Sequence, residues 1–107
     1  MRETSARQVL KHIPFGLPNA ITITKLMELT GINDEMVVRT AISILREHGL
    51  LIFTTDDGRF YQPETPEELE EYRQRRPQDL RAMLAFRQQS KYRFNHGQDM
   101  NHEREEA

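Results

Sequence analysis

The stretch from residue 22 to residue 50 constrains the fold most, because a single glycine separates two helical patterns within it. The apolar residues of the first pattern are Ile23, Leu26, Met27 and Leu29, and those of the second are Val38, Ile42 and Leu45. Gly31 suits the left-handed position that ends a helix, and Asn33 is expected to cap the helix that follows. Two helices joined by so short a turn predict a helix-turn-helix, a unit that usually presents its second helix to a partner.

Two shorter elements are expected before this unit. Ser5 and Gln8 have the spacing of a capping box, which predicts a helix over residues 6–13. Residues 20–22 are short and rich in β-branched side chains, so they predict one small edge strand. Thr22 at the end of that strand also suits the cap of the next helix, because its hydroxyl can accept a free backbone N–H.

A hairpin is expected directly after the helix-turn-helix. Residues 50–54 are rich in strand-forming side chains, and Phe60 and Tyr61 suit a return strand. Asp57 and Gly58 predict a type I′ turn, in which both central residues need a positive φ. Three helices, a small strand and a terminal hairpin together predict a winged helix, which is a mainly α fold with a small β-hairpin.

Another helix is expected after the hairpin. Thr65 suits its cap, Pro66 its first position and Glu68 the far end of a capping box. Pro77 lies inside the helical pattern, so either the helix kinks there or two helices meet. The chain therefore divides into a winged helix-turn-helix domain over residues 1–63, a C-terminal helical extension over 64–94, and an acidic tail, expected to be disordered, over 95–107.

Composition argues against several classes of protein. The chain has no cysteine, which excludes disulfides and thiolate chemistry. No stretch approaches a membrane span and the polar first residues do not match a signal peptide, so a cytoplasmic protein without a membrane partner is expected. The four histidines lack metal-site spacing, and no phosphate loop or nucleophile elbow is present. We therefore expect no catalysis, no cofactor and no metal.

Charge is distributed unevenly along a chain whose formal net charge is −2. Residues 67–93 hold 7 Lys and Arg against 5 Asp and Glu, a net of +2, whereas residues 94–107 hold 1 against 4, a net of −3. The total argues against general coating of nucleic acid, but it leaves room for a local basic surface.

Several of these residues also form a familiar pattern. Leu26, Gly31-Ile32 and the run Glu47-His-Gly-Leu50 resemble the winged-helix domains of bacterial and phage transcription regulators, in the style of the MarR and GntR superfamilies. The run DGRFYQP at 57–63, followed by TPEELEEYRQR, is similar to small helix-turn-helix proteins of prophages and other mobile elements. Over roughly residues 5–93, the resemblance implies a winged helix that binds DNA.

Six residues from both helices of the unit and from the hairpin are candidates for DNA contact: Thr24, Lys25, Arg39, Thr40, Ser43 and Arg59. Arg39 is expected to contact guanine, while Thr40 and Ser43 contact bases or phosphate. Lys25 lies at a helix start, where phosphate can bind, and Arg59 follows the tip of the hairpin. The alternative is that these side chains belong to ordinary solvated faces.

The C-terminal extension carries an apolar stripe that needs a cover: Leu69, Tyr72, Leu80, Met83 and Leu84. A stripe of this length is seldom left in water, so we expect it to pair with a second copy and form a homodimer. Two alternatives stay open. The extension packs back on its own domain with its arginines solvated, or those arginines supply charge to DNA.

Two functions of different classes follow. The first is a transcription regulator of phage or mobile-element origin that binds specific double-stranded DNA as a dimer. The second is a winged-helix adaptor that docks on a transcription, replication or packaging protein without contacting DNA. Asp34 and Glu35 motivate the second, because carboxylates at the start of the recognition helix are repelled by phosphate. Many proteins with the same pattern have Ser or Lys there instead.

Overall fold

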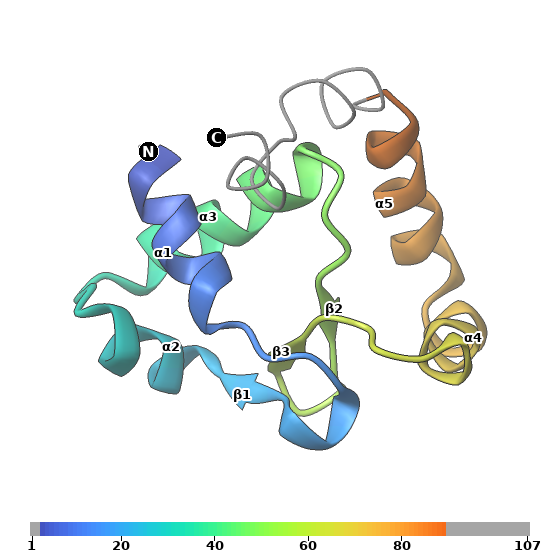
Figure 1. Cartoon of the computed structure of the whole chain (residues 1–107), viewed down its shortest axis with the longest axis horizontal. Helices are drawn as coiled ribbons and strands as arrows, with labels where there is room; N and C mark the ends of the chain where they lie inside the picture. Colours follow the sequence, from blue (N-terminus) through green and yellow to red (C-terminus); the bar gives the residue numbers. More distant parts are fainter. Residues whose placement is uncertain (1–2, 90–107) are drawn as a thin grey trace, which may run out of the picture.

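The structure of the chain is a computed structural model that describes residues 3–89. Within that range the chain is mainly helical and has a small antiparallel sheet, as Figure 1 shows. In chain order the elements are α1 (Glu3–His12), the 3₁₀ helix η1 (Leu17–Asn19), β1 (Ile21–Thr22), α2 (Ile23–Thr30), α3 (Glu35–Glu47), β2 (Phe53–Thr54), β3 (Arg59–Tyr61), α4 (Pro66–Arg75) and α5 (Pro77–Gln89). The predicted acidic tail, residues 95–107, lies outside the described residues.

The sheet has the strand order β1-β3-β2, so the last strand in the chain lies between the other two. Ile21 of β1 and Thr54 of β2 both lie opposite Phe60 of β3, and both pairings are antiparallel. β1 confirms the short edge strand that was predicted over residues 20–22. The segment between α1 and α2 is therefore joined to the hairpin in one sheet.

The strand predicted over residues 50–54 is shorter than expected and begins only at Phe53. The register of β2 on β3 provides the physical reason, because it would bring Leu51 opposite Pro63, which has no N–H to donate. Arg46 of α3 holds the outer edge of the same segment. Its Nε donates to the carbonyl oxygen of Ile52 over 2.9 Å, and its guanidinium also donates to the Thr54 hydroxyl over 3.0 Å, so Arg46 fixes β2 against α3.

The turn between α2 and α3 is close to the prediction but differs by one residue. Thr22 caps α2 as predicted, and Gly31 ends that helix with φ of 76° in the left-handed region. The cap of α3, however, is Asp34 and not Asn33, because its carboxylate accepts from the Met36 N–H over 3.0 Å. Asp34 directly precedes the first helical residue, and an ionised cap makes the stronger hydrogen bond to a helix N-terminus.

The hairpin turn also differs from the prediction by one residue. The Gly58 N–H donates to the carbonyl oxygen of Thr55 over 3.1 Å, so the central residues are Asp56 and Asp57. Gly58 follows them with φ of 84°, as in a three-residue hairpin loop. The predicted type I′ turn centred on Asp57 and Gly58 is therefore wrong. The Thr55 hydroxyl stabilises the longer loop, because it accepts from the Arg59 N–H over 2.9 Å and donates to the Asp57 carboxylate.

Three further predictions concern the ends of α1, α4 and α5. α1 begins at Glu3, so Ser5 lies inside the helix and does not cap it. Thr65 caps α4 as predicted, with its hydroxyl accepting from the Glu68 N–H over 3.1 Å. α5 begins at Pro77, where a proline costs no hydrogen bond, so two helices meet instead of one kinked helix continuing.

The first part of the core lies between α1, α2, α3 and one face of the sheet. Its buried residues are Ala6, Val9, Ile13, Leu26, Val38, Ala41, Ile42, Leu45, Leu50, Ile52 and Phe60. These include Leu26 and the whole predicted stripe of the second helix. Leu29 is a correction, because it is 44% exposed. It follows Met27 by two residues, which places it about 200° around the helix and away from the core.

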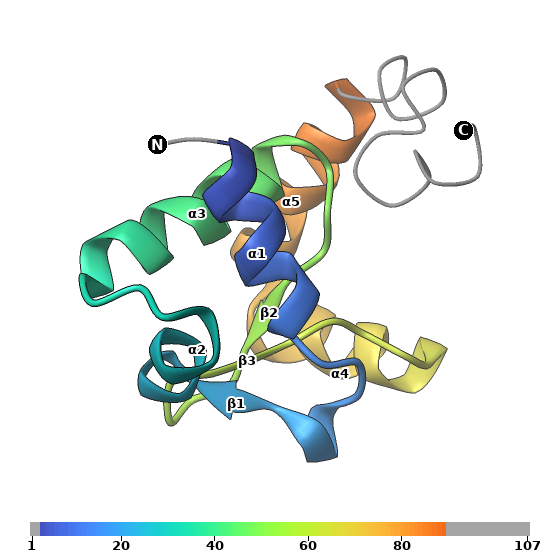
Figure 2. The same cartoon turned by 60° about the vertical axis from the view of Figure 1, so that its left-hand side comes forward.

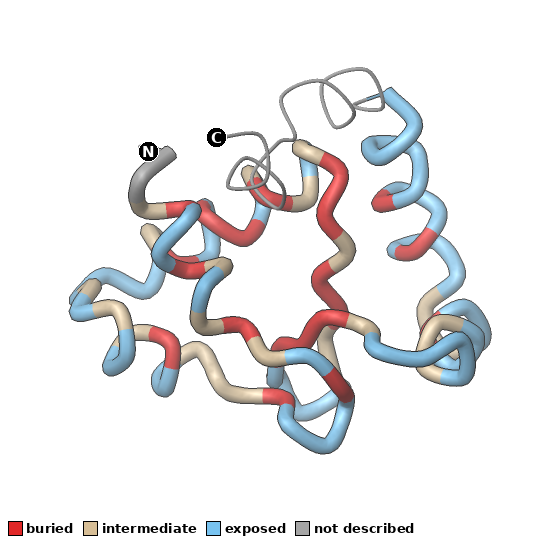
Figure 3. The backbone as a smooth tube through the Cα atoms, in the orientation of Figure 1, coloured by how far each residue is buried: buried red, intermediate tan, exposed pale blue. Residues whose placement is uncertain are grey.

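The second part of the core lies on the opposite face of the sheet, beneath α4 and α5. Neighbouring strand residues point to opposite faces, so Ile52 and Phe60 enter the first cluster while Phe53 and Tyr61 enter the second. The other buried members of the second cluster are Ala20, Tyr72, Leu80 and Met83. Figure 1 shows α4 and α5 on the far side of the hairpin from α2, Figure 2 shows α4 crossing behind the hairpin, and Figure 3 shows the buried positions of α5 on its side toward the hairpin.

The second cluster contains most of the apolar stripe from which a dimer was predicted. Tyr72 and Leu80 are each 1% exposed and Met83 is 4% exposed, and the chain itself covers them. Leu69 is half-buried against the same cluster, whereas Leu84 is 36% exposed. The extension therefore packs back on its own domain, and most of the stripe cannot contact a second copy while this packing persists.

Candidate nucleic-acid interface

The side chains of α3 form two arcs around its axis. The buried arc contains Val38, Ala41, Ile42 and Leu45, and the exposed arc contains Glu35, Met36, Arg39, Thr40 and Ser43. The second list includes all three α3 residues that the sequence nominated for DNA contact. Helical spacing explains the separation, because residues one, four, five and eight positions after Glu35 share its side of the helix. α3 therefore offers one continuous polar surface with a methionine in it.

Arg39 is the cation of this arc, and a carboxylate already holds it. Its Nε lies 2.8 Å from Oε2 of Glu35, one helical turn earlier. Both side chains remain about half exposed, at 51% for Arg39 and 52% for Glu35. An exposed pair at this spacing contributes only about 0.3–0.5 kcal/mol, so a stronger partner can replace it.

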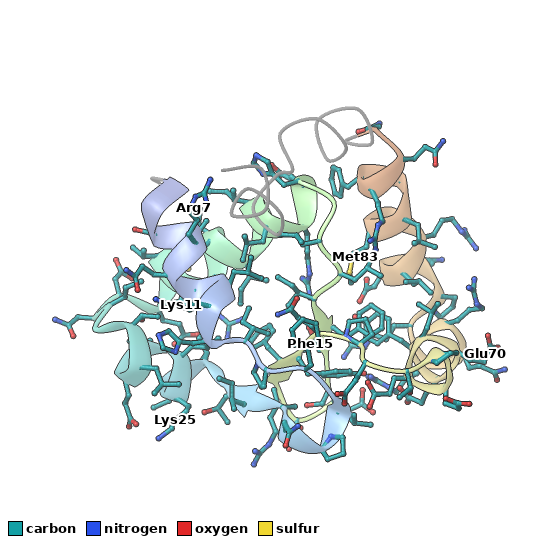
Figure 4. The ribbon with its side chains drawn as sticks, in the orientation of Figure 1. Arg7, Lys11, Phe15, Lys25, Glu70 and Met83 are labelled. Atoms are coloured by element: carbon teal, nitrogen blue, oxygen red, sulfur yellow. The ribbon has the colours of Figure 1, made fainter. Side chains whose placement is uncertain are left out.

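The candidates on α2 lie at the beginning of that helix. Thr24 and Lys25 are exposed, and Figure 4 shows Lys25 projecting from α2 away from the core. The Lys25 ammonium is 3.6 Å from the Glu28 carboxylate, so it too has a local partner. Its backbone N–H donates to the Thr22 hydroxyl over 3.1 Å. Any phosphate bound here would therefore contact the lysine side chain instead of that backbone donor.

Strand pairing places Arg59 beside the start of α2. Arg59 lies directly opposite Thr22 in the β1–β3 pair, only three residues from Lys25 in the chain. Its Nε is 3.1 Å from Oδ2 of Asp57, and both side chains are largely exposed. Hydrogen bonds from Thr55 and then Arg59 hold the pKa of the Asp57 carboxyl below its usual value. The hairpin cation, like Arg39 and Lys25, thus has a carboxylate partner nearby.

The arginines that join α4 to α5 bind the chain itself. Arg75 lies 2.9 Å from Asp56 and 2.8 Å from Glu71, and it donates to the Thr54 carbonyl oxygen over 3.0 Å. These neighbours raise the pKa of Arg75, the Glu71 hydrogen bond most of all. Arg76 pairs with Asp79 over 3.2 Å and reaches Asp56 over 3.5 Å. These two arginines are therefore already engaged within the chain.

Sequence reasoning missed the structural role of two charged residues. Arg46 lies in the last turn of α3, where an arginine normally signals only a favourable helix end. Burial in the structure lowers its pKa, and its hydrogen bonds fix the backbone before and within β2. Asp56 lies in the hairpin loop, but its carboxylate contacts two arginines that follow it by 19 and 20 residues. No local sequence signal predicts so distant a contact.

Residues 3–89 contain neither a metal-binding cluster nor a membrane-spanning helix. No group of three or more His, Cys, Asp or Glu residues in this part of the chain is placed to hold a metal ion. None of the helices in the same range combines the length and the apolar composition needed to cross a membrane. Compared with models of protein families, with curated proteins and with solved structures, the chain gives no significant match.

Proposed function

We propose that the domain is a winged helix-turn-helix that binds duplex DNA, with α3 as recognition helix and the β2–β3 hairpin as wing. The observation that carries this proposal is the exposed arc of α3. The buried arc of the helix fixes it on α1, α2 and the sheet, and the hydrogen-bonding side chains of Arg39, Thr40 and Ser43 lie on the opposite side. The major groove of B-DNA admits one α-helix presented in this way. A small regulator of transcription is the role that suits such a domain best.

The three cations of the interface would contribute differently. Arg39 would reach a base edge, whereas Lys25 and Arg59, which strand pairing holds near each other, would contact the phosphate backbone. Lys25 must first leave Glu28 and Arg59 must first leave Asp57, whereas Arg39 can keep its bond to Glu35 through Nε. Counterion release then involves at most about three phosphates, so the slope of log K against log salt concentration should be no steeper than about −3. Base contacts would have to supply much of the affinity.

Arg39→Ala tests the proposal directly. A randomised duplex library supplies the preferred site, and fluorescence anisotropy on that site at two salt concentrations gives affinity and salt slope. Loss of the arginine should weaken specific binding by about 1–3 kcal/mol. Arg73→Ala is the matched control, because Arg73 pairs with Glu70 on α4 in the same way, and Figure 4 shows Glu70 far from Lys25. Failure to enrich any site, or equal affinity of both variants, would refute the DNA-binding role.

A second candidate, docking on another protein, is favoured by two exposed apolar residues of the same unit. Met36 is 65% exposed and Leu29 is 44% exposed, and three acidic residues, Glu28, Asp34 and Glu35, are exposed nearby in the chain. Aromatic residues, methionine and arginine are enriched in the cores of protein interfaces. Retention of a partner protein at high salt, lost in Met36→Glu and kept in Arg39→Ala, would support this function over DNA binding.

A further inference from the structure

Glu35 and Arg39 are joined before any partner binds. Oε2 of Glu35 accepts a hydrogen bond from Nε of Arg39 over 2.8 Å, one turn along the exposed arc of α3. Within residues 3–89, this is the only hydrogen bond or ion pair of either side chain. The two Nη groups of Arg39 and the Oε1 atom of Glu35 therefore remain available. Together they offer two adjacent donors followed by one acceptor.

We propose that this pair acts as one unit that selects a G·C base pair through its major-groove edge. The inference rests on the proposed function and names the base pair that the recognition helix prefers. A G·C pair presents two acceptors, guanine N7 and O6, followed by one donor, the cytosine N4 amine. The fork of Arg39 would donate to N7 and O6, and Glu35 would accept from N4. The order of donors and acceptors on the two sides matches at all three positions.

An A·T pair does not match the same unit. Its edge presents the acceptor N7, the donor N6 and the acceptor O4, so a donor of Arg39 would meet the adenine amine and Glu35 would face a thymine oxygen. In that complex the Glu35 carboxylate would lose hydrating water without gaining a hydrogen-bond donor, and nearby phosphates would repel it. Binding to an A·T pair would therefore be weaker. Glu35 thus acts against wrong pairs more than it adds affinity for the right one.

The role of Glu35 also accounts for the two carboxylates at the start of α3, which argued against DNA binding. Asp34 has a structural use, since it caps α3 on the Met36 N–H. Glu35 orients the Arg39 guanidinium through Nε and leaves the fork intact, which a carboxylate bonded to the Nη groups would not do. Two carboxylates at the start of the recognition helix are therefore compatible with DNA when one caps the helix and the other accepts from cytosine.

Glu35→Gln tests the unit against Glu28→Gln, which removes the same charge from the Lys25 pair on α2. Each variant and the unmodified chain select from a randomised duplex library, and anisotropy measures affinity for the winning site and for its single-pair replacements. We expect one G·C position in the winning site at which replacement weakens the unmodified chain about ten-fold or more. Glu35→Gln should flatten that preference at this position alone, whereas Glu28→Gln should raise affinity for all duplexes and keep the preference.

A chemical change in the DNA checks the same contact. N4-methylcytosine at the selected position places a methyl group where the groove-facing amine hydrogen lies, so the unmodified chain should lose affinity and Glu35→Gln should lose much less. If a site is enriched but Glu35→Gln and Glu28→Gln keep the same base preferences, this inference is overturned while the proposed function stands. If no duplex is enriched at all, both are overturned.

Discussion

The ring of Tyr72 lies parallel to the ring of Phe53, with 3.9 Å between their centroids and 6° between their planes. Tyr72 belongs to α4 and Phe53 to β2, so this stack joins the C-terminal extension to the hairpin. Tyr61 adds an edge-to-face contact with Phe53, with centroids 5.7 Å apart. Three aromatic residues thus form the centre of the second core cluster, and α4 is a structural part of the domain that carries the proposed wing.

Removal of the Tyr72 ring should destabilise the whole domain. Tyr72 is 1% exposed, so Tyr72→Ala leaves a cavity beside Phe53 and should lower the free energy of unfolding by about 3–5 kcal/mol. Tyr72→Phe keeps the stacked ring and should cost about 1 kcal/mol or less. Urea denaturation measures both values. Leu84→Ala on the exposed side of α5 is the control, and equal effects of Leu84→Ala and Tyr72→Ala would contradict the assigned packing.

Leu80→Ala distinguishes intrachain packing from the dimer that the sequence predicted. Leu80 is buried by its own chain, so the variant should lower the melting temperature by the same amount at every protein concentration. If Leu80 lay in an obligate dimer interface, the melting temperature would instead rise with protein concentration, because unfolding would include dissociation. Thermal unfolding at two concentrations a hundred-fold apart, with light scattering of the unmodified chain, separates the two cases. A melting temperature that rises with concentration would support the predicted dimer.

Features set by neighbouring residues could be predicted from the sequence, and features set by distant residues could not. The caps Thr22 and Thr65 and the left-handed Gly31 follow from local hydrogen bonding, and the structure confirms them. Where two adjacent residues suit one role almost equally, as Asn33 and Asp34 do for the cap of α3, the prediction failed by one position. Local patterns therefore located the helices well and their exact boundaries less well.

The cover of the C-terminal apolar stripe is the clearest case of a missing signal. Periodicity shows that Tyr72 and Leu80 share a face, but it does not say whether a second copy or the other face of the sheet covers them. The ion pairs of two candidate cations, by contrast, could have been predicted from the sequence. Lys25 with Glu28, and Arg39 with Glu35, stand at the three- and four-residue spacings that bring helix side chains together.

Arg75 should stabilise the contact between the hairpin and α4 more than its neighbours on the helix do. Arg75→Ala removes its hydrogen bonds to Asp56, Glu71 and the Thr54 carbonyl oxygen, and we expect a loss of about 1–2 kcal/mol in unfolding free energy. Arg73→Ala breaks one exposed pair on the same helix and should change stability by about 0.5 kcal/mol or less.

A double-mutant cycle isolates the part of this loss that belongs to Asp56. Asp56→Asn combined with Arg75→Ala should cost less than the sum of the single changes, by about 0.5–1 kcal/mol, and the difference should shrink at high salt. Denaturation at low and high sodium chloride concentration supplies the four free energies. Full additivity at low salt would show that the 2.9 Å contact between these two residues contributes nothing to stability.

Acid should weaken the proposed wing through Asp57. Its pKa is lowered in the folded chain, first by the Thr55 hydrogen bond and then by Arg59, so the folded state favours the ionised form. This contribution to stability is complete above the unfolded pKa of about 3.9 and is lost as pH falls through the lower folded pKa.

Thr55→Ala should move the pKa of Asp57 up toward its usual value, measured by NMR titration of the side-chain carboxyl carbon. Thr24→Ala, which leaves the loop unchanged, is the control. An unchanged Asp57 titration in Thr55→Ala would show that the hydroxyl does not hold the carboxylate that pairs with Arg59.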